Sequence, residues 1–177
     1  PLAHDGVMTK YPSRALLVTT SACPVHCRYC FRRHFPYESQ QASRGDWSEA
    51  LRALKNRTGL REVILSGGDP LSLSNRRLRD LVSELETIES VTTVRIHSRF
   101  PIVIPERVDS ELLALLEQTR LRTVLVVHCN HANEIDEAVA NALDQVRATG
   151  TLLLNQSVLL RGVNDDADCL EALSYRL

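Results

Sequence analysis

The chain has 177 residues, 44% of them hydrophobic, which is the size of about one domain with a core of its own. Its formal net charge of −1 gives no electrostatic footprint for nucleic acid, and no apolar run approaches the ~20 residues that span a bilayer. No signal-peptide pattern opens the chain, and its five cysteines, three of them clustered, fit a reducing compartment and a metal site better than a disulfide scaffold. We therefore expect a cytoplasmic protein that binds neither nucleic acid nor a membrane.

Strand patterns and helix patterns alternate along the chain. Apolar, β-branched runs predict strands over residues 15–20, 62–66, 93–97, 123–128 and 152–159. Helical periodicity predicts helices over residues 47–55, 78–88, 110–118 and 135–148, and a last one that begins near Asp166. Asp46, Asn75 and Asp109 are the expected N-caps. Such an alternation is typical of an α/β protein with a parallel sheet.

These elements make five βα units. A complete eight-unit barrel takes roughly 250 residues, so five units predict a partial (β/α) barrel. A doubly wound open sheet is the alternative, because strand order is not visible in a sequence. No G-x-G-x-x-G follows a predicted strand, so nothing favours a dinucleotide fold. We expect residues 1–14 to be a lead-in and residues 15–177 to form the barrel.

A cysteine loop follows the first predicted strand directly. Cys23-Pro-Val-His-Cys27-Arg-Tyr-Cys30 has the spacing C-x₃-C-x₂-C. Thiolates select iron–sulfur clusters, zinc or copper(I). Three thiolates can hold three irons of a four-iron cluster and leave the fourth iron open to a small molecule, whereas electron-carrying clusters usually have four cysteines. A zinc site completed by His26 or His34 and a set of unrelated buried cysteines are the alternatives.

The loop resembles the cluster loop of the radical S-adenosylmethionine (SAM) enzymes, with Tyr29 as the aromatic residue before the last cysteine. The longer string from Cys27 to Tyr37 is similar to the lysine 2,3-aminomutases, in particular to the bacterial group that makes (R)-β-lysine for elongation factor P. This resemblance implies a six-unit partial barrel of the radical SAM type, of which five units are present here. It also implies a [4Fe–4S] cluster on the three cysteines, SAM on the open iron, and an electron donor such as flavodoxin or ferredoxin. An oligomer is compatible with it.

Candidate SAM contacts lie where the predicted strands end, as ligands do in parallel α/β folds. Gly67 and Gly68 have no Cβ and so leave room for a ligand near the backbone. The resemblance assigns them, with Asp69, to the amino-acid end of SAM; a tight turn is the alternative. Gln156 lies within an apolar predicted strand, where an unpaired amide is costly. The resemblance assigns it to SAM as well, and a structural amide is the alternative.

Further candidates follow the third and fourth predicted strands. Ser98 and Arg99 are weaker SAM candidates, and Tyr29 is expected near the adenine. His128 and His131 lie three residues apart at a strand end, which does not match a metal pair on a helix. We interpret them as core or cofactor-stacking histidines.

The resemblance also implies pyridoxal phosphate (PLP). Arg14, nine residues before Cys23, occupies the position from which the family binds the phosphate, and Lys10 corresponds less closely to a second basic ligand. Arg32 corresponds to the arginine that pairs with the carboxylate of the substrate, L-lysine, a task that suits a bidentate guanidinium. Arg33 alone is interpreted as a solvated surface charge.

A PLP enzyme needs a lysine for its Schiff base, and this chain has only Lys10 and Lys55. The resemblance places that lysine, and the aspartates for the substrate ammonium group, in a C-terminal region that is not in this sequence. Because the chain starts at Pro1 and stops inside a predicted helix, we expect a fragment that is inactive alone. An aminomutase for glutamate or another amino acid, and a non-catalytic iron–sulfur or zinc module, are the alternative functions.

Overall fold

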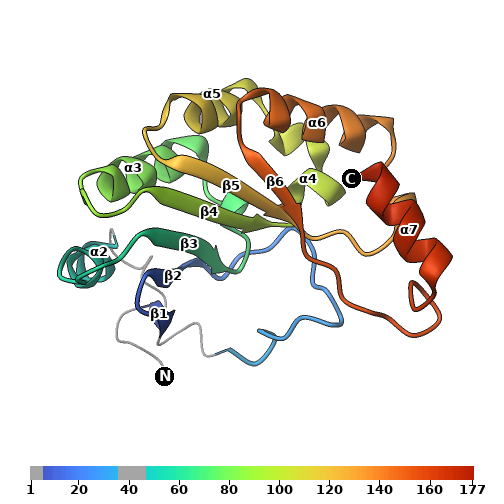
Figure 1. Ribbon diagram of the computed structural model, residues 1–177, viewed down its shortest axis with the longest axis horizontal. Coiled ribbons are helices and arrows are strands. Elements are labelled where there is room, and N and C mark those ends of the chain that lie inside the picture. Colours follow the sequence, from blue (N-terminus) through green and yellow to red (C-terminus); the bar gives the residue numbers. More distant parts are fainter. Residues whose placement is uncertain (1–5, 36–46) are drawn as a thin grey trace.

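Six strands form one sheet, in the order in which they follow each other along the chain. They are β1 (Val7–Tyr11), β2 (Arg14–Thr20), β3 (Glu62–Gly67), β4 (Thr93–Ser98), β5 (Arg122–Val127) and β6 (Leu152–Asn155). β1 pairs with β2 in the antiparallel sense, and every other neighbouring pair is parallel. This computed structural model describes residues 6–35 and 47–177. Figure 1 shows the sheet as an open, twisted layer.

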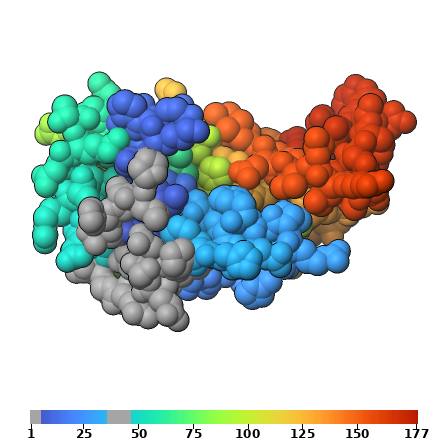
Figure 2. All heavy atoms as spheres, turned by 90° about the horizontal axis from the view of Figure 1, so that it is seen from below, coloured from blue at the N-terminus to red at the C-terminus, as the bar shows by residue number. Residues whose placement is uncertain are grey.

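The helices follow the parallel strands. They are α2 (Ser48–Lys55), α3 (Asn75–Glu86), α4 (Phe100–Val103), α5 (Ser110–Gln118), α6 (Glu137–Ala148) and α7 (Ala167–Arg176), with short 3₁₀ turns η2 (Pro70–Ser72), η3 (Pro105–Arg107) and η4 (Ala132–Glu134). α2, α3, α5 and α6 pack against one face of the sheet, which we call the helix face. The other, open face bears the segment that follows β2 (Figures 1 and 2). None of the described helices is long and apolar enough to cross a membrane.

This architecture confirms the predicted partial barrel. Five parallel strands, β2 to β6, give the five expected units, and the sheet does not close. Their strictly sequential order excludes the doubly wound alternative, in which the strand order reverses within the sheet. β1 was not predicted. It lies in the stretch expected to be a lead-in, and its pairing with β2 makes it part of the sheet.

β6 is shorter than predicted, because it ends at Asn155 and not at residue 159. Its partner β5 ends at Val127, whose carbonyl accepts a last backbone hydrogen bond from Gln156 at 2.8 Å. Beyond that point the chain is held by side chains: the Val158 amide donates to Asn130 Oδ1 at 2.8 Å. The prediction that Gln156 lies within a strand was therefore wrong.

The helix starts show which cap predictions were right. Asp109 caps α5 as expected, since its carboxylate accepts from the Leu112 amide. The N-cap of α3 is Ser74, and Asn75 is the first helical residue; its amide instead donates to the Asp109 carboxylate at 2.9 Å. α2 begins after Trp47, and Asp46 lies outside the described residues.

The core lies between the sheet and its helices. Alternate strand side chains such as Val63 and Leu65 point to the helix face and meet Leu78, Leu81 and Leu85 of α3. All five are at most 1% exposed. Full burial of each aliphatic side chain stabilises the fold by roughly 1.5–3 kcal/mol, so this packing holds the strands in register.

Candidate functional site

The three cysteines of the loop lie together beyond the end of β2. Cys23 is exposed, and Cys27 and Cys30 are half-buried. Burial, followed by the Asp69 carboxylate and the other two thiols, raises the pKa of Cys23 to about 11. In the described parts of the chain, no three Cys, His, Asp or Glu side chains are placed to hold one metal ion. Three thiols from one loop are the donor set of a four-iron cluster with one open iron, and this role for the three cysteines stays a prediction.

The Gly67-Gly68 turn at the end of β3 packs directly against the start of this loop. The Gly68 amide donates to the Thr20 carbonyl at 2.7 Å, and the Asp69 amide donates to the Ala22 carbonyl at 2.8 Å. A Cβ on Gly67 would lie 2.9 Å from the Thr20 carbonyl oxygen, and one on Gly68 would collide with Ala22. The space that we expected to admit a ligand is therefore filled by the protein's own backbone. Contact between these glycines and SAM stays a prediction.

Asp69 joins the ends of β3 and β4. Its buried carboxylate accepts hydrogen bonds from the Leu71 amide at 3.0 Å, the Ser98 hydroxyl at 2.7 Å and the Arg99 amide at 2.7 Å. Burial raises the pKa of Asp69, and these hydrogen bonds oppose that rise. Asp69 and Ser98 thus position two loops next to the cysteines, and their predicted contacts with SAM remain untested predictions.

Tyr29 is fixed by residues that directly follow β4 and β5. Its hydroxyl accepts hydrogen bonds from the Arg99 guanidinium and, at 2.7 Å, from Asn130 Nδ2. Arg99 in turn forms an ion pair with Glu134 at 2.5 Å. Burial raises the pKa of Tyr29, while the Arg99 charge lowers it. Sequence reasoning missed Asn130 and Glu134.

A second missed feature is a row of charges on the open face. Glu62 is 7% exposed and lies between two arginines, at 2.8 Å from Arg14 Nε and 2.5 Å from Arg95 Nε. Arg14 and Lys10 also line one groove of about 450 Å³, with apolar walls that include Ile64. Arg14 is the first residue of β2, so this groove lies at the opposite end of that strand from the cysteine loop.

Two histidines meet on the open face at the other end of the sheet. The rings of His97 and His128 stand at 87° with centroids 5.6 Å apart, and His128 Nε2 lies 3.4 Å from His97 Nδ1. Burial lowers the pKa of each to about 4, so both are neutral at pH 7. The Gln156 side chain lies beside His97, and its contact with SAM stays a prediction. His131 instead caps η4, away from His128.

Arg32 points inward, and Arg33 does not. Arg32 is 8% exposed, with Nη1 at 3.7 Å from Met8 Sδ of β1 and the guanidinium over the rings of Phe31 and Phe35. Arg33 is exposed, as expected of a surface charge. The Arg32 guanidinium lies against β1, the edge strand of the sheet. Its predicted role, binding the substrate carboxylate, stays a prediction.

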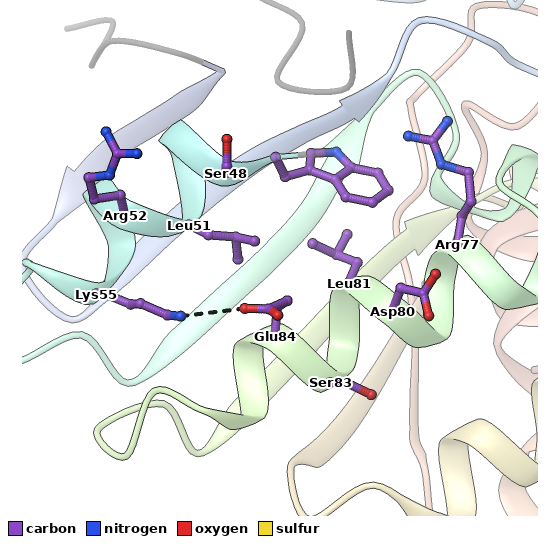
Figure 3. A pocket seen from close by; sticks show the side chains of 10 residues that line it. Ser48, Leu51, Arg52, Lys55, Arg77, Asp80, Leu81, Ser83 and Glu84 are labelled. Carbon is purple, nitrogen blue, oxygen red and sulfur yellow. Dashed lines mark hydrogen bonds and ion pairs between the residues drawn. The ribbon is translucent and has the colours of Figure 1, made fainter. Parts of the chain in front are cut away.

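The two sides of the molecule carry different hollows. Figure 2 looks onto the side that bears the light-blue cysteine segment, which lies between the dark-blue N-terminal strands and the orange-red C-terminal segment. Figure 3 shows a hollow of about 840 Å³ between α2 and α3, on the helix side. Lys55 of α2 lies there and pairs with Glu84 of α3 at 3.4 Å.

Known proteins match nearly all of this chain. Residues 17–172 match the family described as the Radical SAM superfamily. The chain is 47% identical to the L-lysine 2,3-aminomutase of Haemophilus influenzae over 175 residues, which are 99% of this chain and 52% of that protein. It is 47% identical to the Escherichia coli L-lysine 2,3-aminomutase over 172 residues (97% and 50%), and 38% identical to that of Clostridium subterminale over 173 residues (97% and 41%). The chain spans about half the length of the curated relatives that it matches.

Proposed function

The chain belongs to the radical SAM superfamily, and on this premise we propose that the protein is an L-lysine 2,3-aminomutase that makes (R)-β-lysine, for the modification of elongation factor P. The observation that carries the proposal is the C-x₃-C-x₂-C loop at the carboxyl edge of the parallel sheet, in a chain similar to L-lysine 2,3-aminomutases over nearly all its length. The cytoplasm is the proposed compartment, and flavodoxin or ferredoxin the proposed class of electron donor.

Cys23, Cys27 and Cys30 would hold the [4Fe–4S] cluster. With SAM, the cluster would supply radical chemistry that removes a hydrogen atom from the substrate. The chain's own contribution is to fix the loop: the glycine turn is hydrogen-bonded to the backbone just before Cys23. Ser98 and Asp69 lock the neighbouring loop, so SAM would meet a preformed surface at this edge.

Arg14 and Lys10 would bind the phosphate of PLP. The groove between them is open, and the Arg14 side chain, which pairs with Glu62 through Nε, is 53% exposed, so an anion can reach its guanidinium. Arg32 would bind the carboxylate of lysine. Lys55 is on the helix side, so we place the Schiff-base lysine outside these 177 residues.

The test uses the full-length protein, reconstituted anaerobically with iron and sulfide. We expect about four irons per chain, a spectrum perturbed by SAM, and β-lysine by mass spectrometry after incubation with SAM, PLP, reductant and L-lysine. Cys27→Ala should abolish SAM cleavage, and Cys169→Ala is the matched control, because Cys169 lies at α7 and not in the loop.

Two outcomes would contradict the proposal in different ways. Full iron content and SAM cleavage in Cys27→Ala would show that Cys27 is not a cluster ligand. About one zinc per chain in a colourless protein would indicate a non-catalytic module. Conversion of glutamate in preference to lysine would leave the cluster in place and overturn only the substrate.

A further inference from the structure

The hydroxyl of Tyr29 joins the cysteine loop to the segments that follow β4 and β5. Tyr29 lies between Cys27 and Cys30, and its oxygen accepts from the Arg99 guanidinium and from Asn130 Nδ2. A phenol has one proton and two lone pairs, so two donors fill its acceptor sites and its own proton stays available. The Tyr29 hydroxyl also lies close enough to the Cys27 thiol for the charge of one group to affect the other. An aromatic ring alone would be enough for stacking on adenine, so the hydroxyl has a separate task.

Asn130 is held at every polar group of its side chain. It is 4% exposed; Nδ2 donates to Tyr29, and Oδ1 accepts from the Val158 amide at 2.8 Å. Its backbone carbonyl accepts from Nδ2 of the fully buried Asn164 at 2.7 Å. These contacts fix the orientation of the Asn130 amide, so it presents a donor, and not an acceptor, to the cysteine loop. In Figure 1 the ends of β4, β5 and β6 approach the light-blue segment here.

Glu134 controls both donors to Tyr29. One carboxylate oxygen pairs with Arg99 Nη2 at 2.5 Å. The other accepts from the backbone amides of Asn130 at 2.7 Å and His131 at 3.1 Å. Charge-assisted hydrogen bonds of this kind are the strongest and most directional that a protein makes. A single carboxylate on η4 therefore sets the positions of the guanidinium and of the asparagine that meet at the tyrosine.

We infer that this network is a tether that fixes the cysteine loop and tunes the cluster through Cys27, with Asn130 and Glu134 as positioning residues that act through Arg99 and Tyr29. The inference rests on the proposed function only in that the three cysteines hold the cluster. Hydrogen bonds to ligand sulfur and nearby positive charge stabilise an added electron, so they raise the reduction potential. A tyrosine polarised by an arginine and an amide is a stronger donor than one that faces water. The tether thus makes the cluster easier to reduce.

Tyr29→Phe in the full-length protein tests this directly, because it removes one oxygen and keeps the ring and all three cysteines. The midpoint potential is measured by redox titration followed by electron paramagnetic resonance. We expect it to fall by about 59 mV, which corresponds to a tenfold change in the equilibrium of a one-electron couple. We also expect a weaker change of the spectrum on addition of SAM. Tyr175→Phe is the matched control, since Tyr175 is 84% exposed on α7, and it should leave the potential unchanged.

Asn130→Leu is the second variant, because it removes the amide donor to Tyr29 at similar side-chain volume and leaves the charges of Arg99 and Glu134 in place. It should lower the potential in the same direction and by less. If Tyr29→Phe folds but takes up no iron, Asn130→Leu decides between the outcomes. Unchanged potentials in the cluster-bearing variants would overturn the tether and leave the proposed function intact, whereas a parent protein that takes up no iron would overturn the proposed function itself.

Discussion

The two faces of the sheet differ although the same strands make both. On β3, Val63 and Leu65 point to the helices and are completely buried. The alternate residues Glu62 and Ile64 point to the open face, where Glu62 forms ion pairs and Ile64 lines the groove beside Arg14. Side chains alternate along a strand, so on β3 the odd-numbered residues stabilise the core and the even-numbered ones line the open face.

The polar side chains of the open face have partners within the protein. A buried charge or amide without a partner is costly, and here each finds one from a neighbouring strand. Glu62 of β3 bridges Arg14 of β2 and Arg95 of β4, and His97 of β4 meets His128 after β5. These pairs hold the polar groups in place before any ligand binds, which is what a preorganised site requires.

The largest expected effect is on the helix face. Leu65→Ala should lower the free energy of unfolding by ~2–5 kcal/mol, because the side chain is fully buried and its removal leaves a cavity. Ile64→Ala, one residue earlier on the half-buried open face, should lower it by much less. Urea unfolding of both variants measures the difference. Equal losses would show that the two faces contribute alike to stability.

Arg14→Ala tests the opposite face through ligand binding. If Arg14 binds the PLP phosphate, its loss in the full-length protein should weaken PLP affinity by ~1.5–3 kcal/mol, typical of a charged hydrogen bond, with the cluster intact. Arg33→Ala is the control, because Arg33 is exposed. If Arg14→Ala and the parent bound PLP equally well, Arg14 would have only a structural role, in its ion pair with Glu62.

Periodicity and spacing were enough for the elements that depend on local sequence. The five βα units, the Asp109 cap and the cysteine loop could all be predicted, because each is specified within a few residues. β1 could not, since a five-residue edge strand is defined by its antiparallel partner and carries little periodicity of its own. Arg95 between Val94 and Ile96 was a readable sign of a polar face, and it was overlooked.

The parts of the site that were missed depend on long-range register. Glu62 and Arg95 are 33 residues apart in sequence, and Asn130 and Tyr29 are 101 residues apart. No local pattern relates such pairs, because their contact follows from how parallel strands align. Asn130 lies in the polar stretch after the fourth predicted strand, but nothing near it in the sequence relates it to Tyr29, whose expected place near the adenine stays a prediction.

The histidines of the open face make the stability of the folded protein depend on pH. The pKa of His97 and of His128 is lowered from 6.5 to about 4, so below pH 6.5 the unfolded chain binds protons that the folded protein does not. Stability is therefore full above pH 6.5 and falls as the pH drops toward 4. For one histidine the loss between pH 6.5 and 5 is about 2 kcal/mol. His97→Asn should flatten the dependence of the urea midpoint on pH, whereas the exposed His26, changed in the same way, should not.

The smallest effect is expected from Glu62→Gln, which removes the charge between the two arginines and keeps the shape of the side chain. The partners are partly exposed, Arg14 by 53% and Arg95 by 25%, so water screens the guanidinium groups left behind. We expect a loss of about 1 kcal/mol in the free energy of unfolding. It should shrink in 1 M salt, where the Debye length is only about 3 Å. Glu84→Gln, which breaks the more exposed pair with Lys55, is the control and should have no measurable effect. If Glu62→Gln instead destabilised the protein as strongly as Leu65→Ala, the ion pairs of the open face would be part of what holds the sheet together, and the separation of a stabilising face from a chemical face would be lost.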